Sequence, residues 1–148
     1  MKMIVVLLVL FVTTVEKGHT QVSPYLTTGI SFSFGRGGYV YITPKITYGV
    51  MTVPVMHYIN ATISYSFGWS RDPFWSLYSE YGLAYVGVGA GVSMMEKGGI
   101  DLYSFRGNVF IGAVPFLNYT YHYKPEFPDN MGMEFVLPLR YNEDAFKL

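Results

Sequence analysis

The chain has 148 residues, of which 51% are hydrophobic and only 14% are charged, whereas an average soluble domain is about 25% charged. Ten basic residues balance ten acidic residues, so the sequence lacks the basic excess of a protein that binds nucleic acid. The 18% content of aromatic residues excludes an intrinsically disordered chain. The absence of cysteine excludes disulfide scaffolds, thiolate metal sites and cysteine nucleophiles.

The first twenty residues differ from the rest of the chain. A short basic start at Lys2 precedes an uncharged apolar run from Ile4 to Val15. This run of 12 residues has the size of a signal-peptide core and is too short for a transmembrane helix, which needs about 20 residues. We therefore expect a signal peptide over residues 1–20 and an exported single domain over residues 21–148. The alternative is a short N-terminal anchor or a buried strand.

Beyond residue 20, apolar residues alternate with small or polar ones, and no stretch holds a helical period. The segments Ile30–Gly35 (ISFSFG) and Ile63–Gly68 (ISYSFG) show the alternation most clearly. A period of two predicts strands that have one apolar and one polar face. We place strands at residues 24–34, 38–48, 56–68, 76–85, 86–95, 99–113, 115–124 and 131–141.

Residues 76–95 contain no cluster of turn-forming residues like those between the other expected strands, but the apolar parity changes within them. Leu77 and Leu83 are apolar at odd positions, whereas Val86 and Val88 are apolar at even positions. Such a change requires a turn or a bulge near Tyr85. A turn gives eight strands, and a bulge gives seven strands of which one is very long. We predict an all-β fold, a single antiparallel up-and-down barrel of about eight strands.

The chemistry of the two strand faces favours a membrane barrel. The polar face carries Ser, Thr and Asn, whereas a water-facing sheet usually carries Lys and Glu. The apolar face is dense in Phe, Tyr and Ile, as expected where aromatic rings lie at lipid–water interfaces. The polar face includes Ser31, Ser33, Thr62, Ser64, Asn108 and Thr120, and the apolar face includes Phe32, Phe34, Ile63, Phe105, Val109 and Tyr121. A soluble barrel with an apolar interior shows the same alternation and stays the alternative.

Six charged residues of the expected strands all lie on the polar face. They are Lys45, Glu80, Arg106, Lys124, Glu134 and Arg140. A charge on the lipid face costs about 2–4 kcal/mol at the bilayer midplane. Because buried charges need partners, we expect these six side chains to form a charge network inside the barrel. Side chains fill the interior of an eight-stranded barrel, so we expect no open pore.

The leader, the length, the alternating segments and the aromatic content make residues 24–141 resemble the small eight-stranded outer-membrane barrels of Gram-negative bacteria. The resemblance is architectural and includes no diagnostic motif. It implies an outer-membrane location and contact with membrane lipid. The sequence departs from this pattern at its end, because such barrels usually end on an aromatic residue, whereas Tyr141 is followed by Asn142 to Leu148.

The same resemblance brings one kind of enzyme into consideration. Small outer-membrane barrels include lipid A deacylases, which use a histidine, a serine two residues later and a glutamate further on. His122 and Glu134 match two of these positions, but Lys124 occupies the position of the serine. The nucleophile is therefore missing from the motif, unless Ser104 supplies it. The simpler interpretation of His122 is a hydrogen-bonded residue of the barrel interior.

The remaining candidates are a metal site and an aromatic turn. The sequence has no closely spaced set of His, Asp and Glu, so we expect no metal and no cofactor. Trp69, Phe74 and Trp75 fall within a single expected turn. We expect their rings to anchor that turn at the membrane interface or to contact a partner.

These observations predict a non-enzymatic barrel in the outer membrane. Its role would be structural or adhesive, or that of an accessory subunit that contacts another envelope protein. One alternative is a secreted or periplasmic soluble β-barrel that binds an apolar ligand. The other is an outer-membrane lipid-modifying enzyme centred on His122 and Glu134.

Overall fold

The protein is an all-β barrel of eight antiparallel strands that pair in sequence order and close between β1 and β8. The computed structural model describes residues 21–35, 37–53, 56–69, 71–112 and 114–140, so the expected signal peptide and the residues after 140 lie outside it. Within that part of the chain, no helix is long and apolar enough to cross a membrane. The strands are β1 (Gln21–Gly35), β2 (Tyr39–Val53), β3 (His57–Gly68), β4 (Arg71–Leu83), β5 (Val86–Lys97), β6 (Ile100–Gly112), β7 (Phe116–His122) and β8 (Asn130–Arg140).

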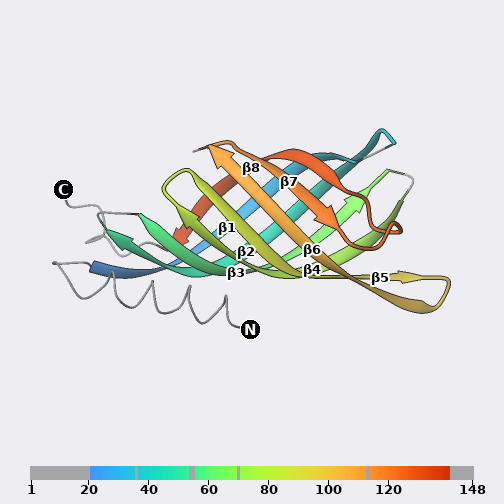
Figure 1. Ribbon diagram of the computed structural model, residues 1–148, viewed down its shortest axis with the longest axis horizontal. Helices are drawn as coiled ribbons and strands as arrows, with labels where there is room; N and C mark the ends of the chain where they lie inside the picture. The colour runs from blue at the N-terminus through green and yellow to red at the C-terminus, as the bar shows by residue number, and fades with distance from the viewer. Residues whose placement is uncertain (1–20, 36, 54–55, 70, 113, 141–148) are drawn as a thin grey trace.

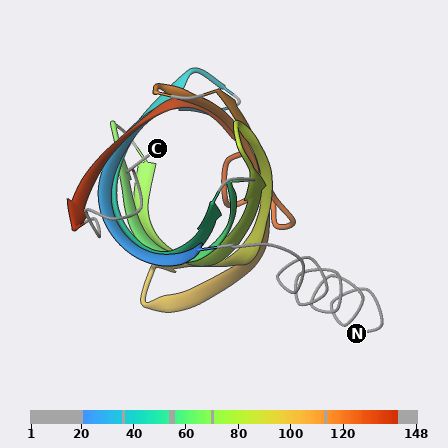
Figure 2. The same cartoon turned by 90° about the vertical axis from the view of Figure 1, so that its left-hand side faces the viewer.

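The barrel has two distinct ends. The terminus end is where β1 begins and β8 ends, together with the connections β2–β3, β4–β5 and β6–β7. The loop end holds the other four connections, and there the β5–β6 hairpin extends furthest from the barrel (Figure 1). Viewed along the barrel, the strands form a closed ring (Figure 2). Closure leaves no strand edge without a partner.

The parity change within residues 76–95 is a turn, so the barrel has eight strands and the seven-strand alternative is wrong. Leu83 pairs with Val86 across a connection made of Ala84 and Tyr85. Ala84 has a φ of 51°, which lies in the left-handed region that residues with a side chain rarely adopt. Its amide donates a hydrogen bond to the carbonyl of Met56 at 3.0 Å, which ties this turn to the β2–β3 connection.

β1, β2, β4 and β5 are longer than the sequence indicates. β2 continues to Val53, past Gly49, where the expected strand ends at residue 48. β4 begins at Arg71, so most of the expected turn over residues 69–75 is strand. Pro73 does not prevent this, because proline is tolerated near the start of a strand. The last strand ends at Arg140, and Tyr141 lies outside the described residues.

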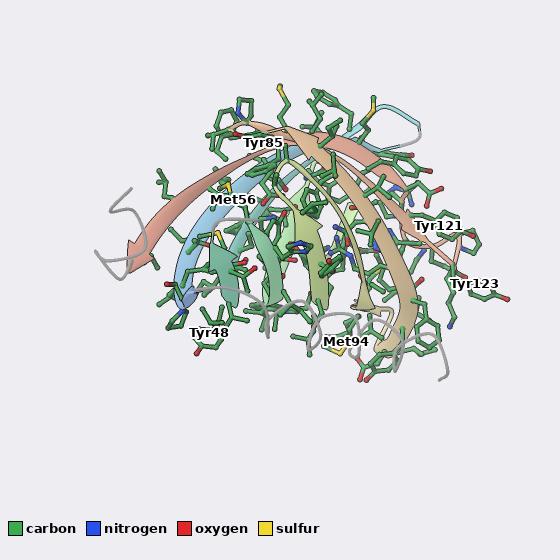
Figure 3. The ribbon with its side chains drawn as sticks, turned by 60° about the vertical axis from the view of Figure 1, so that its left-hand side comes forward. Tyr48, Met56, Tyr85, Met94, Tyr121 and Tyr123 are labelled. Carbon is green, nitrogen blue, oxygen red and sulfur yellow. The ribbon has the colours of Figure 1, made fainter. Side chains whose placement is uncertain are left out.

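The structure confirms the assignment of the two strand faces. Side chains of the polar face point into the barrel, and Thr62, Ser93 and Ser64 are almost fully buried. Side chains of the apolar face point outward, with exposed fractions of 73% for Phe105 and 53% for Ile46. Figure 3 shows labelled examples of the outer face, including Tyr48 and Tyr121. The barrel is thus polar inside and apolar outside, the reverse of a soluble domain.

Glycines on the inner face of β5 allow β4 to approach it closely. A Cβ atom at Gly91 would lie 2.2 Å from the carbonyl oxygen of Leu77 and 2.5 Å from Cα of Tyr78. At Gly89 it would lie 2.8 Å from Cγ of Glu80. The run Gly87-Val88-Gly89-Ala90-Gly91 is therefore explained by close backbone approach between β4 and β5.

We predict that Gly91→Ala destabilises the barrel, because backbone atoms of β4 occupy the space that the new methyl group needs. Overpacking of this kind costs about 1–3 kcal/mol. The measurement is the urea midpoint of the detergent-solubilised protein. Gly107→Ala is the matched control, since its nearest atom is the Gly89 carbonyl oxygen at 3.9 Å. Equal midpoints for the two variants would contradict this account.

Candidate functional site

The middle of the barrel interior is organised around a buried ion pair. The ammonium group of Lys45 on β2 contacts the carboxylate of Glu134 on β8, and their side chains are only 5% and 12% exposed. Lys45 also donates a hydrogen bond to the Tyr78 hydroxyl at 3.4 Å. We call Lys45, Tyr78, Glu80, Arg106 and Glu134 the central layer. A cavity of only about 30 Å³ remains among these and neighbouring side chains.

The second cation of the central layer is held by a ring rather than by a carboxylate. The guanidinium carbon of Arg106 lies 3.8 Å from the centre of the Tyr78 ring. Its Nη2 atom donates a hydrogen bond to the Thr120 hydroxyl at 3.3 Å. A cation over an aromatic face is attracted by the electron density of the ring, and more strongly where water is excluded.

Glu80 is held by two amides. Its Oε1 accepts a hydrogen bond from Asn108 at 2.8 Å, and its Oε2 accepts one from Asn60 at 3.2 Å. The backbone amide of Glu80 donates to the Asn60 side-chain oxygen in return, at 3.2 Å. Within the described residues the ion pair is Lys45 with Glu134. The carboxylate of Glu80 therefore has polar neighbours there, and Lys45 acts on it electrostatically, but no basic side chain lies within ion-pair distance of it.

Of the six charges expected in the interior, four point inward, one is corrected and one stays untested. Lys45, Glu80, Arg106 and Glu134 point into the barrel as the sequence indicates. Lys124 does not, because β7 already ends at His122 and Lys124 is exposed in the connection that follows. The side chain of Arg140 lies outside the described part of the structure.

An aromatic cluster fills the loop end of the barrel interior. Tyr41, Phe74, Met95 and Phe127 are each at most 3% exposed and pack together. Phe127 comes from the β7–β8 connection, which folds inward, and its ring meets that of Phe74 edge-on at 5.8 Å. We call these four residues the loop-end plug. It closes the interior on that side with apolar side chains.

The expected aromatic anchors separate into two groups. Phe74 is not an anchor, because it lies on the inner face of β4 and is buried in the loop-end plug. Trp69 and Trp75 are exposed, at 83% and 48%. The Trp75 ring lies 4.6 Å from that of Tyr65 on the outer surface. Only these two of the three aromatic residues face the surroundings of the barrel.

His122 is a hydrogen-bonded residue of the interior. Its Nδ1 lies 2.9 Å from the carbonyl oxygen of Pro128, and its Nε2 lies 3.1 Å from the Ser93 hydroxyl. Because a carbonyl oxygen only accepts, Nδ1 donates, and in the neutral ring Nε2 then accepts the proton of Ser93. Ser93 in turn accepts a hydrogen bond from Ser76 at 2.8 Å. The Phe127 ring stacks on the His122 ring, with ring centres 5.6 Å apart, and covers this series of hydrogen bonds.

The structure does not bring together the residues of the deacylase comparison. Glu134 contacts Lys45 in the central layer, and its other contact is Asn118, at 3.2 Å. Ser104 accepts a hydrogen bond from the amide of Lys124 at 3.0 Å. The hydroxyl beside His122 belongs to Ser93, which the sequence does not single out. Ser93 is 0% exposed, so no substrate reaches it in this structure.

A larger cavity lies at the terminus end of the interior. It measures about 200 Å³. Its walls are largely aromatic and apolar, from Tyr25, Met51, Met56, Tyr58, Phe110, Phe116 and Val136, and the carboxylates of Glu80 and Glu134 also line it. The Tyr58 and Phe110 rings are stacked with centres 6.1 Å apart. We call it the terminus-end cavity.

Comparisons with known proteins supply no family. No family model and no curated protein matches the chain. One solved structure similar to it is a designed protein described as "De novo design of transmembrane beta-barrels". The similarity covers 78% of this chain and 95% of the designed chain, with a TM-score of 0.48 and 6% sequence identity.

Within the described residues, no group of three or more His, Asp or Glu side chains is placed to hold a metal ion.

We predict that Lys45→Met strongly destabilises the barrel, because it leaves the Glu134 carboxylate buried without its cation. Removing one partner of a buried pair costs about 3–5 kcal/mol. The double variant Lys45→Met/Glu134→Gln should be less destabilised than Lys45→Met alone, since it also removes the unpaired charge. The measurement is the urea dependence of the fluorescence of Trp69 and Trp75 in detergent.

Lys97→Met is the matched control for this pair, because Lys97 is exposed at the end of β5 in the loop-end hairpin. Its unfolding free energy should stay within about 0.5 kcal/mol of the unmodified chain. A Lys45→Met variant as stable as this control would show that the ion pair does not organise the interior.

Proposed function

We propose that the chain is an integral β-barrel of the outer membrane of a Gram-negative type of envelope, with a structural, adhesive or accessory role and no catalysis. The observation that carries the proposal is the reversed distribution of polarity. Large apolar side chains are exposed on all eight strands, and the interior holds the hydroxyl, amide and charged groups. A water-soluble protein exposing this much contiguous apolar surface would aggregate.

The placement of charges agrees with a barrel that spans a bilayer. Within the described residues, the exposed charged residues lie at the loop end: Arg71, Asp72, Glu96, Lys97, Asp101, Lys124 and Glu126. Between the two ends the outer surface is apolar. Exposed tyrosines occur toward both ends, with Tyr48 and Tyr85 toward the terminus end and Tyr121 and Tyr123 toward the loop end (Figure 3). Such aromatic girdles flank the apolar band of membrane barrels.

The soluble alternative agrees poorly with this arrangement. A secreted barrel that binds an apolar ligand needs its Phe and Ile face inside, where a ligand would contact it. Phe34 and Ile63 are instead exposed, at 59% and 49%. To stay in solution, such a barrel would need another protein that covers its entire apolar outer surface.

The interior supports a role without transport or catalysis. The central layer fills the cross-section of the barrel, and the loop-end plug closes one side of it. The one serine–histidine pair found in the described residues, Ser93 with His122, is covered by Phe127. A Ser–His pair needs access to substrate and a group that stabilises the developing oxyanion. We therefore assign His122 to the packing of the plug.

We predict that the full chain, expressed in a Gram-negative host, fractionates with the outer membrane. Its mobility on a denaturing gel should shift on boiling, because the closed barrel resists detergent until heated. In a closed barrel every strand satisfies its backbone hydrogen bonds with the strands on its two sides.

The control for this experiment is Ile63→Asp/Leu77→Asp, which puts two charges on the lipid face and should abolish membrane recovery of the folded form. Recovery of the unmodified chain as a soluble protein without a heat shift would contradict the proposal. So would membrane recovery that the two aspartates leave unchanged.

A further inference from the structure

The terminus-end cavity combines aromatic walls with a negatively charged side. Tyr58 and Phe110 stack along one wall, and Phe116 meets Phe110 edge-on with ring centres 6.0 Å apart. Met51 and Met56 add two thioethers. Glu80, which belongs to the central layer, also lines this cavity. We propose that this cavity binds an organic ammonium ion that carries a small apolar body.

The charge of Glu80 is the first argument. Its two oxygens accept one hydrogen bond each, from Asn60 and Asn108, whereas a carboxylate offers about four acceptor positions. The nearby cation Arg106 is turned toward the Tyr78 ring. Within the described residues, Glu80 is thus a carboxylate that has spare acceptor capacity and no ion-pair partner. An ammonium group that enters the cavity supplies both the charge and the donors.

The aromatic and thioether walls of the cavity also favour an organic cation. Aromatic faces attract cations electrostatically, and quaternary and primary ammonium groups are recognised in this way. Thioethers adapt their shape to an apolar ligand. A volume of about 200 Å³ accommodates a single ring on a short chain rather than a large metabolite. Aromatic rings and a carboxylate in one cavity are complementary to a cation with an apolar body.

Other classes of ligand fit less well. An anion would meet the carboxylates of Glu80 and Glu134. A bare metal ion would find no cluster of three ligating side chains in the described part of the chain. A purely apolar molecule would offer Glu80 neither a positive charge nor a hydrogen-bond donor, and an uncompensated buried charge is costly. An organic ammonium ion can interact favourably with the carboxylate, the aromatic rings and the thioethers of this cavity.

The test uses the folded full chain in octyl glucoside, a detergent without an amine, with its methionine methyl groups labelled for NMR. The probe is 2-phenylethylamine, and 2-phenylethanol is its uncharged analogue. The methyl signals of Met51 and Met56 should shift saturably with the amine. Met94, which points outward (Figure 3), should not shift. The alcohol should bind at least about tenfold more weakly, because it lacks the charge-assisted hydrogen bond to Glu80.

The matched variants are Glu80→Gln and Glu126→Gln, which remove the same charge from the cavity and from the exposed β7–β8 connection. Glu80→Gln should weaken amine binding at least about tenfold, and Glu126→Gln should leave it unchanged. Amine and alcohol binding with equal affinity would overturn the proposal, and this comparison needs no variant to fold. Equal affinity of the unmodified chain and Glu80→Gln would also overturn it, as would shifts at Met94 instead of Met51 and Met56.

The ammonium group has two natural sources, a soluble amine or the headgroup of a membrane lipid. A short-chain phosphatidylethanolamine, added in place of 2-phenylethylamine, distinguishes them, with short-chain phosphatidylglycerol as its control. Shifts at Met51 and Met56 with phosphatidylethanolamine alone would identify a headgroup site. Shifts with the soluble amine alone would identify a site for a free amine, and no shift with either would overturn the proposal.

Discussion

The structure depends on one constraint: the polar groups inside a narrow closed barrel have only each other as partners. Because side chains alternate between the two faces of a strand, the outer surface is apolar while the inner surface carries the polar groups. Lys45 and Glu134 meet this constraint by forming an ion pair with each other. They lie on β2 and β8, the two neighbours of β1, so their ion pair spans the seam where the barrel closes. Arg106, Tyr78 and Glu80 complete the same layer with contacts to rings and amides.

The strand pattern could be predicted from the sequence, because period-two alternation is a local property. The alternation in residues such as Ile30–Phe34 and Ile63–Phe67 predicts both faces correctly, and the parity change near Tyr85 indicates a turn or a bulge, which the structure shows to be a turn. The turn itself contains no residue typical of turns, because Ala84 takes a left-handed conformation that glycine or asparagine usually supplies. The start of β4 was missed for the opposite reason. Arg71-Asp72-Pro73 has turn chemistry, yet it belongs to β4, where Arg71 pairs with Gly68 and the register then shifts before Phe74 pairs with Ser66.

The interior could be predicted only in part, because its contacts join residues that are far apart in sequence. The pair Ser93 and His122 is separated by 29 positions and depends on the register of three strands. The burial of Phe74 depends on how the β7–β8 connection folds and brings Phe127 inward. Glycines decide the shape of the terminus-end cavity, since Gly82 and Gly87 leave space for the rings of Tyr58 and Phe110. No local pattern encodes these long-range fits.

The central claim is that the apolar outer face contacts lipid, and the absence of cysteine from the chain allows a direct measurement. Single cysteines placed in turn at residues 75–81 of β4 can carry a nitroxide spin label in phospholipid vesicles. We expect relaxation by oxygen, which dissolves in the bilayer, to alternate along the strand, with maxima at outward positions such as Leu77 and minima at inward positions such as Ser76. Relaxation of the outward labels by a water-soluble nickel chelate instead would contradict the account.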